Sequence, residues 1–251
     1  MALVTDLYRY PVKGLSAEPQ GRVTLAVGEG VPLDRAFAIA HGTTRFDPDA
    51  PQPLPKTHFL MLAVNERMAA LKSAYDDTTG VLTINRDGRA VVRAKPDQPG
   101  GRQVIEQFFA AYMKDECRGA PRLVHAPGHT FADCKAKRLS LIGLPSICDL
   151  ERVVRQPVDP VRFRANVYFD GTEPWAEFGW IGREIIMGTA RLRVVARIDR
   201  CPATDVNPGS ARRDMNIPRA LQAGFGHIDM GVYAEVVQSG DVAVGDRLDA
   251  G

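Results

Sequence analysis

Residues 191–207 read RLRVVARIDRCPATDVN, and this stretch predicts a β-strand that ends at a cysteine. In its first half, apolar residues alternate with mostly charged ones, as they do in a strand with one buried face. The alternation places Cys201 on the charged face, and Pro202 ends the strand because it has no backbone donor. Because nearby positive charge stabilises a thiolate, Cys201 is a candidate reactive thiol; a buried, inert cysteine is the alternative.

A second stretch, RFRANVYF at residues 162–169, shows the same alternation. It predicts a strand that carries Arg162, Arg164 and Asn166 on its polar face. Guanidinium groups bind phosphate through paired hydrogen bonds, and an asparagine side chain offers both a donor and an acceptor. The two arginine-bearing strands therefore indicate a small-anion site near the thiol, with a solvated basic face as the alternative.

The composition is that of a globular protein. The chain has 251 residues, of which 45% are hydrophobic and 25% charged, with 23 glycines and 18 prolines, and this content favours short strands joined by turns. The net charge of +2 argues against a general surface for nucleic acid. The sequence contains no basic leader and no apolar run long enough to span a bilayer, so we expect a cytoplasmic protein without a membrane partner.

The cysteines are spaced too far apart for a metal or redox motif. Cys117, Cys134, Cys148 and Cys201 form no C-x-x-C pair, which argues against a zinc ribbon and a thioredoxin-like site. We assign a role only to Cys201.

The whole pattern predicts a mainly β protein with some helix, organised in two domains, residues 1–118 and 119–251. The predicted helices cover residues 101–113 and 145–154, where apolar residues recur at helical spacing. The further predicted strands lie at residues 3–10, 21–27, 36–40, 81–84, 90–94, 123–125, 139–142, 231–237 and 241–248.

Several motifs together resemble the MOSC family, named after the C-terminal domain of molybdenum cofactor sulfurase. They are RANV at 164–167, EPW at 173–175, RCPATDVNP at 200–208 and GDVAVGD at 240–246. In the first half, YPVKG at 10–14 and DRAF at 34–37 resemble the domain that precedes many MOSC domains. The resemblance implies an N-terminal β-barrel-like domain followed by a MOSC β-barrel decorated by helices.

The resemblance also implies site residues, because in the mitochondrial amidoxime-reducing components and their bacterial relatives the motif cysteine ligates molybdenum held by molybdopterin. It implies that Cys201 is the metal ligand and the catalytic residue. The implied contacts to the cofactor or to the loop that presents the thiolate are Lys13, Arg35, Arg164, Asn166, Arg200 and Thr204. Gly14 stands where the family often has a serine, and either Arg45 or Lys56 corresponds to a further basic contact.

The function implied by this resemblance is a molybdenum-dependent reductase of N-hydroxylated compounds. Its partners would be a small-molecule substrate and an external reductase, or a ferredoxin- or cytochrome-type protein, that supplies electrons. The alternative is a sulfur carrier or a molybdenum cofactor-binding module that uses a Cys201 persulfide. We expect no direct binding of pyridoxal phosphate by this chain.

Overall fold

A closed ring of seven strands forms the larger part of the molecule, which we call the barrel lobe. The structure is a computed structural model that describes residues 1–134 and 136–251. Around the ring the order is β1, β10, β9, β13, β12, β11 and β15, and β15 pairs with β1 again. The bounds are β1 Ala2–Arg9, β9 Leu139–Gly143, β10 Val167–Asp170, β11 Glu184–Met187, β12 Ala190–Asp199, β13 Asp229–Gln238 and β15 Arg247–Asp249.

Alternating apolar side chains fill the barrel, as the period of a strand requires. On β12, Leu192, Val194 and Ile198 are buried, while Arg191 and Arg193 on the other face are exposed. The predicted alternation is therefore confirmed on this strand, although its pairing with β13 shifts register near Val194. Three short strands extend the barrel lobe: β2 Glu18–Gln20, β3 Arg22–Leu25 and β14 Gly240–Ala243.

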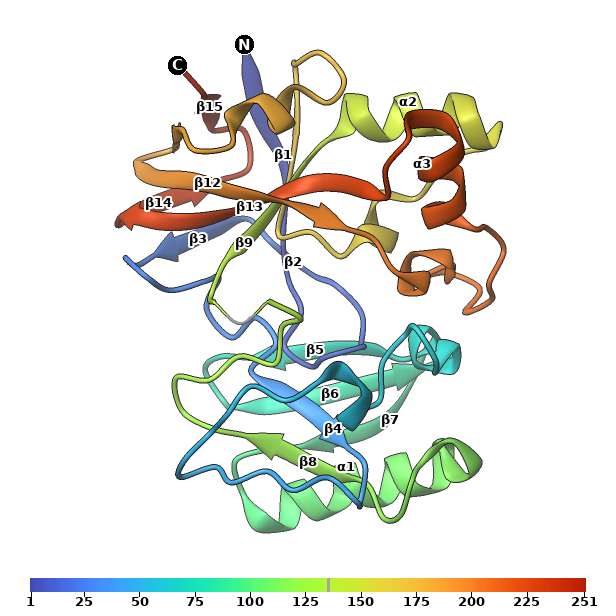
Figure 1. Cartoon of the computed structure of the whole chain (residues 1–251). Coiled ribbons are helices and arrows are strands. Elements are labelled where there is room, and N and C mark those ends of the chain that lie inside the picture. Colours follow the sequence, from blue (N-terminus) through green and yellow to red (C-terminus); the bar gives the residue numbers. More distant parts are fainter. Residues whose placement is uncertain (135) are drawn as a thin grey trace.

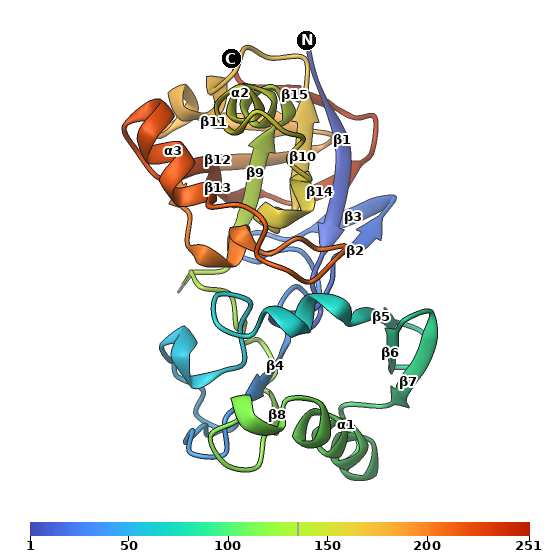
Figure 2. The ribbon, with the colours of Figure 1, turned by 90° about the vertical axis from the view of Figure 1, so that its right-hand side faces the viewer.

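Two helices pack on the barrel, and a third helix lies at the far end of the other lobe (Figures 1 and 2). Helices α2 (Leu144–Val154) and α3 (Ile217–Phe225) share an apolar cluster with β10 that includes Leu150, Leu221 and Tyr168. In the described part of the chain, no helix combines the length and the apolar character that a membrane crossing requires.

The small lobe, residues 37–125, lies below the barrel in Figure 1 and is built from two sheets and a helix. Its strands are β4 Phe37–Ala40 and β8 Arg122–His125 in one sheet, and β5 Lys72–Asp76, β6 Val81–Arg86 and β7 Arg89–Ala94 in the other. Helix α1 (Pro99–Tyr112) buries Ile105 and Phe109 in the core of this lobe. The prediction of a mainly β protein with helices on its barrel is confirmed.

The division of the chain at residue 118 stays a proposal, and the strand pairing bears on where such a boundary lies. Strands β1 to β3, from the start of the chain, pair with strands of the barrel lobe. Strand β8, which follows residue 118, pairs with β4 in the small lobe. Each lobe therefore contains chain from both sides of the proposed boundary.

The prediction that residues 162–169 form one strand is wrong in its first half. Pro160–Phe163 form a short 3-10 helix, and Arg164 follows in the left-handed region with φ +54°. The strand begins only at Val167. Sequence alternation missed this because a buried loop can also alternate polar and apolar side chains, and here the polar ones find partners in the interior.

We predict that Glu177 makes the stability of the fold depend on pH. Its carboxylate is fully buried, and it accepts hydrogen bonds from Ser146 Oγ at 3.0 Å and Gly143 N at 3.3 Å. Burial raises the pKa of this carboxyl above its ordinary value of 4.5. A raised folded-state pKa means that stability is full below 4.5 and falls as the pH rises and the buried group ionises.

Glu177→Gln should remove this fall while keeping the acceptor oxygen. The free energy of unfolding of the variant, minus that of the wild type, should increase between pH 4.5 and about pH 8 in urea titrations. Parallel pH profiles for the two proteins would contradict the prediction.

Candidate functional site

Cys201 lies where the chain leaves the barrel, two residues after β12 ends at Asp199. It is half-buried, and its backbone is held by Thr204, whose amide and hydroxyl both donate to the Cys201 carbonyl at 3.1 and 2.9 Å. Pro202 opens the short 3-10 helix Pro202–Asp205 in a position where its missing N–H costs nothing. The thiol therefore sits on a loop with a defined backbone.

Arg200 anchors this loop from the inside. Its side chain is 8% exposed, and its guanidinium donates to the carbonyl of Met230 at 2.9 Å and to that of Phe163 at 2.9 Å. Burial lowers the pKa of Arg200, and no carboxylate within the described residues pairs with it. Arg200 directly precedes Cys201 in the chain. It thus ties the Cys201 loop to β13 and to the 3-10 helix before Arg164, and it acts as a positioning residue.

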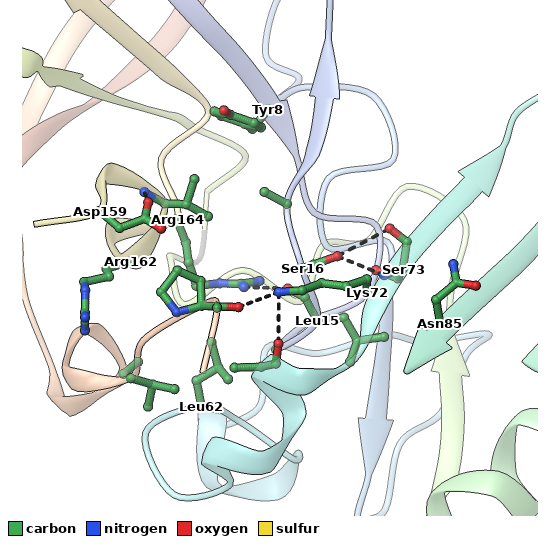
Figure 3. A pocket seen from close by; sticks show the side chains of 18 of the residues that line it. Tyr8, Leu15, Ser16, Leu62, Lys72, Ser73, Asn85, Asp159, Arg162 and Arg164 are labelled. Carbon is green, nitrogen blue, oxygen red and sulfur yellow. Dashed lines mark hydrogen bonds between the residues drawn. The ribbon is translucent and has the colours of Figure 1, made fainter. Parts of the chain in front are cut away.

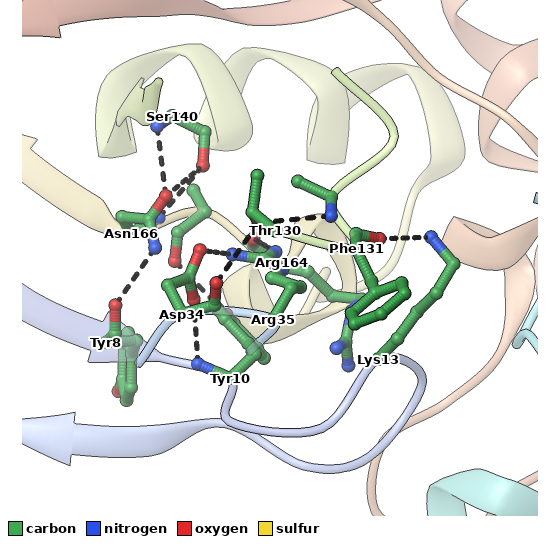
Figure 4. A network of polar contacts seen from close by, with 12 residues as sticks. Tyr8, Tyr10, Lys13, Asp34, Arg35, Thr130, Phe131, Ser140, Arg164 and Asn166 are labelled. Atoms are coloured by element: carbon green, nitrogen blue, oxygen red, sulfur yellow. Dashed lines mark hydrogen bonds and ion pairs between the residues drawn. The ribbon is translucent and has the colours of Figure 1, made fainter. Parts of the chain in front are cut away.

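Three basic side chains lie close together in this part of the molecule, Arg35 and Arg164 at the ring of Tyr10 and Lys13 beside Phe131 (Figure 4); we call them the cation cluster. The guanidinium carbons of Arg35 and Arg164 lie 4.2 and 4.4 Å from the centre of the fully buried Tyr10 ring. The Tyr10 hydroxyl donates to the Ala165 carbonyl at 3.1 Å. The aromatic face stabilises both cations at once.

Both arginines of the cation cluster have an uncommon backbone conformation. Arg35 has φ +52° and Arg164 has φ +54°, values that cost energy for residues with a side chain. The Arg35 guanidinium donates to the Arg164 carbonyl at 2.7 Å, and the Arg164 guanidinium donates to the Leu15 carbonyl at 2.5 Å. Such strain is common at binding sites, where the surroundings hold a residue in one pose.

The positive charges in the cation cluster are close enough to affect one another. Burial, followed by the charge of Arg35, lowers the pKa of Arg164 to about 10. For Arg35, burial acts to lower the pKa, but the carboxylate of Asp34 beside it has the larger effect. The net result is a raised pKa for Arg35. At neutral pH both guanidinium groups remain charged.

Lys13, the third member, points its ammonium group at the loop that joins the lobes. It is 8% exposed, donates to the Phe131 carbonyl at 2.8 Å and forms an ion pair with Asp133. Lys56 Nζ lies 3.9 Å from the other oxygen of Asp133. The positive charge of Lys13 lowers the pKa of Asp133 against the effect of burial. Asp133 is thus a carboxylate held among the cations of this site.

Lys56 is the better candidate for the further basic contact. Arg45 lines a different cavity of the small lobe, together with Arg122 and Asp47. Lys56 Nζ lies 3.9 Å from Asp133, the same carboxylate that pairs with Lys13 of the cation cluster.

Gly14 is explained by the packing around it. Its φ is +83°, and a Cβ atom there would lie 2.8 Å from the terminal carbon of Met68. A serine in its place would need both a strained backbone and a shift of Met68.

Asn166 makes hydrogen bonds inside the barrel lobe, and its contact with a cofactor stays a prediction. Its Oδ1 accepts from the amide and the hydroxyl of Ser140 at 3.1 and 2.9 Å, and its Nδ2 donates to the Tyr8 carbonyl at 3.2 Å. The residue is 2% exposed and ties the end of β1 to β9 at the start of β10. One amide hydrogen remains for another partner.

Tyr233 is a partly buried residue of β13 that lies opposite Ala196 of β12 and Ser140 of β9. Burial raises the pKa of its phenol, while the positive charges of Arg200 and Arg35 act in the opposite direction. Sequence reasoning missed Tyr233, Asp133 and the role of Tyr10; only Tyr10 carried a signal, inside the YPVKG motif.

This arrangement can hold an anion beside a single thiol. Among the described residues, no three histidine, cysteine or acidic side chains gather as they would around a metal ion. A metal at Cys201 must therefore bring its other ligands with it.

Comparison with known proteins gives one family match. A family model described as "MOSC domain" matches residues 127–249. No curated protein sequence matches the chain.

Two solved structures are remotely similar to the chain. The YuaD protein from Bacillus subtilis is 16% identical, with 99% of this chain and 94% of that one covered and a TM-score of 0.46. YiiM from Geobacillus stearothermophilus is 20% identical, with 44% of this chain and 52% of that one covered and a TM-score of 0.35.

We predict that the Thr204 hydroxyl stabilises the Cys201 loop. Thr204→Val should lower the free energy of unfolding by about 1 kcal/mol, because it removes the hydrogen bond to the Cys201 carbonyl. Thr5 is a matched control, since its buried Oγ1 has no partner among the described residues. Thr5→Val should leave stability unchanged or raise it. Equal losses in the two variants, measured by urea unfolding, would contradict the role of Thr204.

Proposed function

Residues 127–249 are a MOSC domain, and from this premise we propose that the chain binds molybdenum cofactor and reduces N-hydroxylated compounds with it. Cys201 would be the metal ligand, and the cation cluster would bind the phosphate and the pterin. The observation that carries the proposal is the pair of guanidinium groups, Arg35 and Arg164, over the Tyr10 ring. The residue before Arg164 is Phe163, whose carbonyl accepts a hydrogen bond from Arg200, the anchor of the Cys201 loop.

The donor set at Cys201 fits this cofactor better than it fits a bare ion. A single thiolate is a soft ligand and suits a sulfur-rich metal centre. Because the described residues supply no further cluster of metal ligands, the remaining ligands must belong to the group that binds. A pterin dithiolene provides two sulfur ligands of its own, so one protein thiolate is sufficient.

The cation cluster fits the phosphate end of the same group. Arg35 and Lys13 have carboxylate partners in Asp34 and Asp133, whereas Arg164 has none within the described residues. The planar guanidinium binds phosphate oxygens in a bidentate manner, and the Tyr10 ring holds it in position. Lys13 donates to the Phe131 carbonyl and pairs with Asp133, so one of its three ammonium hydrogens remains for a phosphate oxygen.

In the proposed mechanism the residues of the chain bind the cofactor and orient it. Arg200 and Thr204 fix the Cys201 loop, while Arg35 and Arg164 hold the anionic end of the bound group. When bound, the molybdenum cofactor would supply the two-electron chemistry that takes the oxygen from an N–OH group and releases it as water. Electrons would come from a separate reductase or from a ferredoxin- or cytochrome-type protein.

A second candidate is a sulfur carrier that uses a persulfide on Cys201. The observation in its favour is that Cys201 is half-exposed and that, among the described residues, it belongs to no group of three metal-ligating side chains. A carrier needs an accessible thiol and does not need the cation cluster.

We predict that molybdenum and pterin co-purify with the wild-type chain from a host that makes the cofactor and are lost from Cys201→Ala. Cys148→Ala is the control, because Cys148 is an exposed thiol on α2. Metal analysis and pterin fluorescence give the contents. If the wild type carries cyanide-releasable sulfur but neither molybdenum nor pterin, the carrier replaces the reductase.

We also predict that Arg164→Met lowers pterin retention by about tenfold, because the guanidinium fork is lost. Arg155→Met is a closely matched control. Arg155 is exposed at the end of α2 and has φ +58°, so both substitutions act on an arginine in the left-handed region. Retention unchanged in Arg164→Met, or lowered equally in both variants, would remove Arg164 from the binding site.

A further inference from the structure

A cavity of about 480 Å³ lies between the two lobes and shares Arg164, but neither Lys13 nor Arg35, with the cation cluster (Figure 3). Its volume is within the range of about 300–1,000 Å³ that is typical of sites for small organic molecules. The small lobe contributes Ala69, Lys72 and Ala74, and the barrel lobe contributes Val161, Arg164 and Ala203. Cys201 and Lys13 do not line it.

The wall of this cavity is mainly aliphatic. Leu62, Ala69 and Val206 line it together with the residues named above, and more of the lining surface is apolar than polar. Burial of an apolar ligand surface against such a wall favours binding. The body of a ligand here should therefore be apolar.

Lys72 supplies a cation at the mouth of the cavity. Its ammonium donates to the Ala69 carbonyl at 3.2 Å and to the Pro208 carbonyl of the other lobe, as Figure 3 shows. An ammonium has three hydrogens, so one donor remains. No carboxylate of the described residues lies within ion-pair distance of Lys72; burial lowers its pKa, and the more distant Asp159 acts in the opposite direction.

The other charged groups on the wall are already engaged or face solvent. Arg162 pairs with Asp214 at 2.6 Å, and Arg164 belongs to the cation cluster. Asp159 is exposed and accepts from the Val161 amide at 2.9 Å. Lys72 is therefore the cation with a donor to spare.

Two polar groups of the wall have no partner among the described residues. Ser73 and Arg162 are 6% and 4% exposed, yet Ser73 Oγ and Arg162 Nε make no hydrogen bond. Buried polar atoms are rarely left unpaired, and an exception calls for a bound water, ion or ligand nearby. Both residues line this cavity.

We propose that this interlobe cavity is a binding site for an amphipathic monocarboxylate, with an aliphatic or aromatic body against the apolar wall and the carboxylate on Lys72. An occupant contacts both lobes, so its binding stabilises the folded chain. The site is separate from the proposed cofactor site, although Arg164 lies on the border of both.

The test is isothermal titration of the purified full chain with octanoate, 1-octanol and octylamine, which share one apolar body. Octanoate should bind at least about tenfold more tightly than 1-octanol, and octylamine should bind more weakly than either, because only the carboxylate gains a charge-assisted hydrogen bond. Octanoate should also raise the melting temperature. Equal binding of octanoate and 1-octanol, or no binding of octanoate at millimolar concentration, would overturn the proposal.

Three variants locate the site. Lys72→Met should weaken octanoate binding by about tenfold, whereas Lys114→Met, at an exposed position that does not line the cavity, should leave it unchanged. Ala74 shares the exposed face of β5 with Lys72, so Ala74→Phe should fill the cavity and abolish binding. If Ala74→Phe does not fold, the octanoate affinity of Lys72→Met alone decides whether the cavity is the binding site. If Lys72→Met binds octanoate as tightly as the wild type does, the assignment of the carboxylate to Lys72 is overturned. This result is independent of the molybdenum content, which tests the proposed cofactor site.

Discussion

The contact of two guanidinium groups with the ring of Tyr10 is the interaction on which the site depends. Arg35 and Arg164 come from segments far apart in the sequence, and both lie over one buried aromatic ring. Their mutual repulsion is offset by the ring and by Asp34, while the Tyr10 hydroxyl joins the cluster to the barrel through the Ala165 carbonyl. This cluster fixes the start of the chain against the barrel and leaves a concentration of positive charge.

The charge in this cluster explains the path of the loop that joins the lobes. Asp133 and the carbonyl of Phe131 approach Lys13, and the amide of Phe131 donates to the Arg35 carbonyl at 2.8 Å. The loop thus places the carboxylate of Asp133 at the proposed phosphate site. The negative charge of Asp133 would repel a phosphate that binds Lys13, so affinity at this site is lower than the number of cations alone would imply.

The two lobes meet at two neighbouring but chemically different places. On one side, cations surround Tyr10 and the loop of Cys201 is anchored by Arg200. On the other, the cavity beside Lys72 is mainly aliphatic. Arg164 belongs to both, because its left-handed backbone directs the side chain across the border between the lobes. A change in the angle between the lobes would therefore affect both places.

The sequence by itself determined the parts of the structure that depend on local burial. Alternation identified β12, helical spacing identified α1 and α2, and the motifs pointed to Cys201, Lys13, Arg35 and Arg164. These patterns are readable because a strand or a helix must bury one face wherever it packs. Only the tertiary structure decided the rest: that residues 162–166 leave the strand pattern, that Asn166 bonds to Ser140, and that Asp133 pairs with Lys13. Those outcomes depend on which distant segments meet. The local sequence around a polar side chain does not reveal which residue that side chain will bond to in the folded protein.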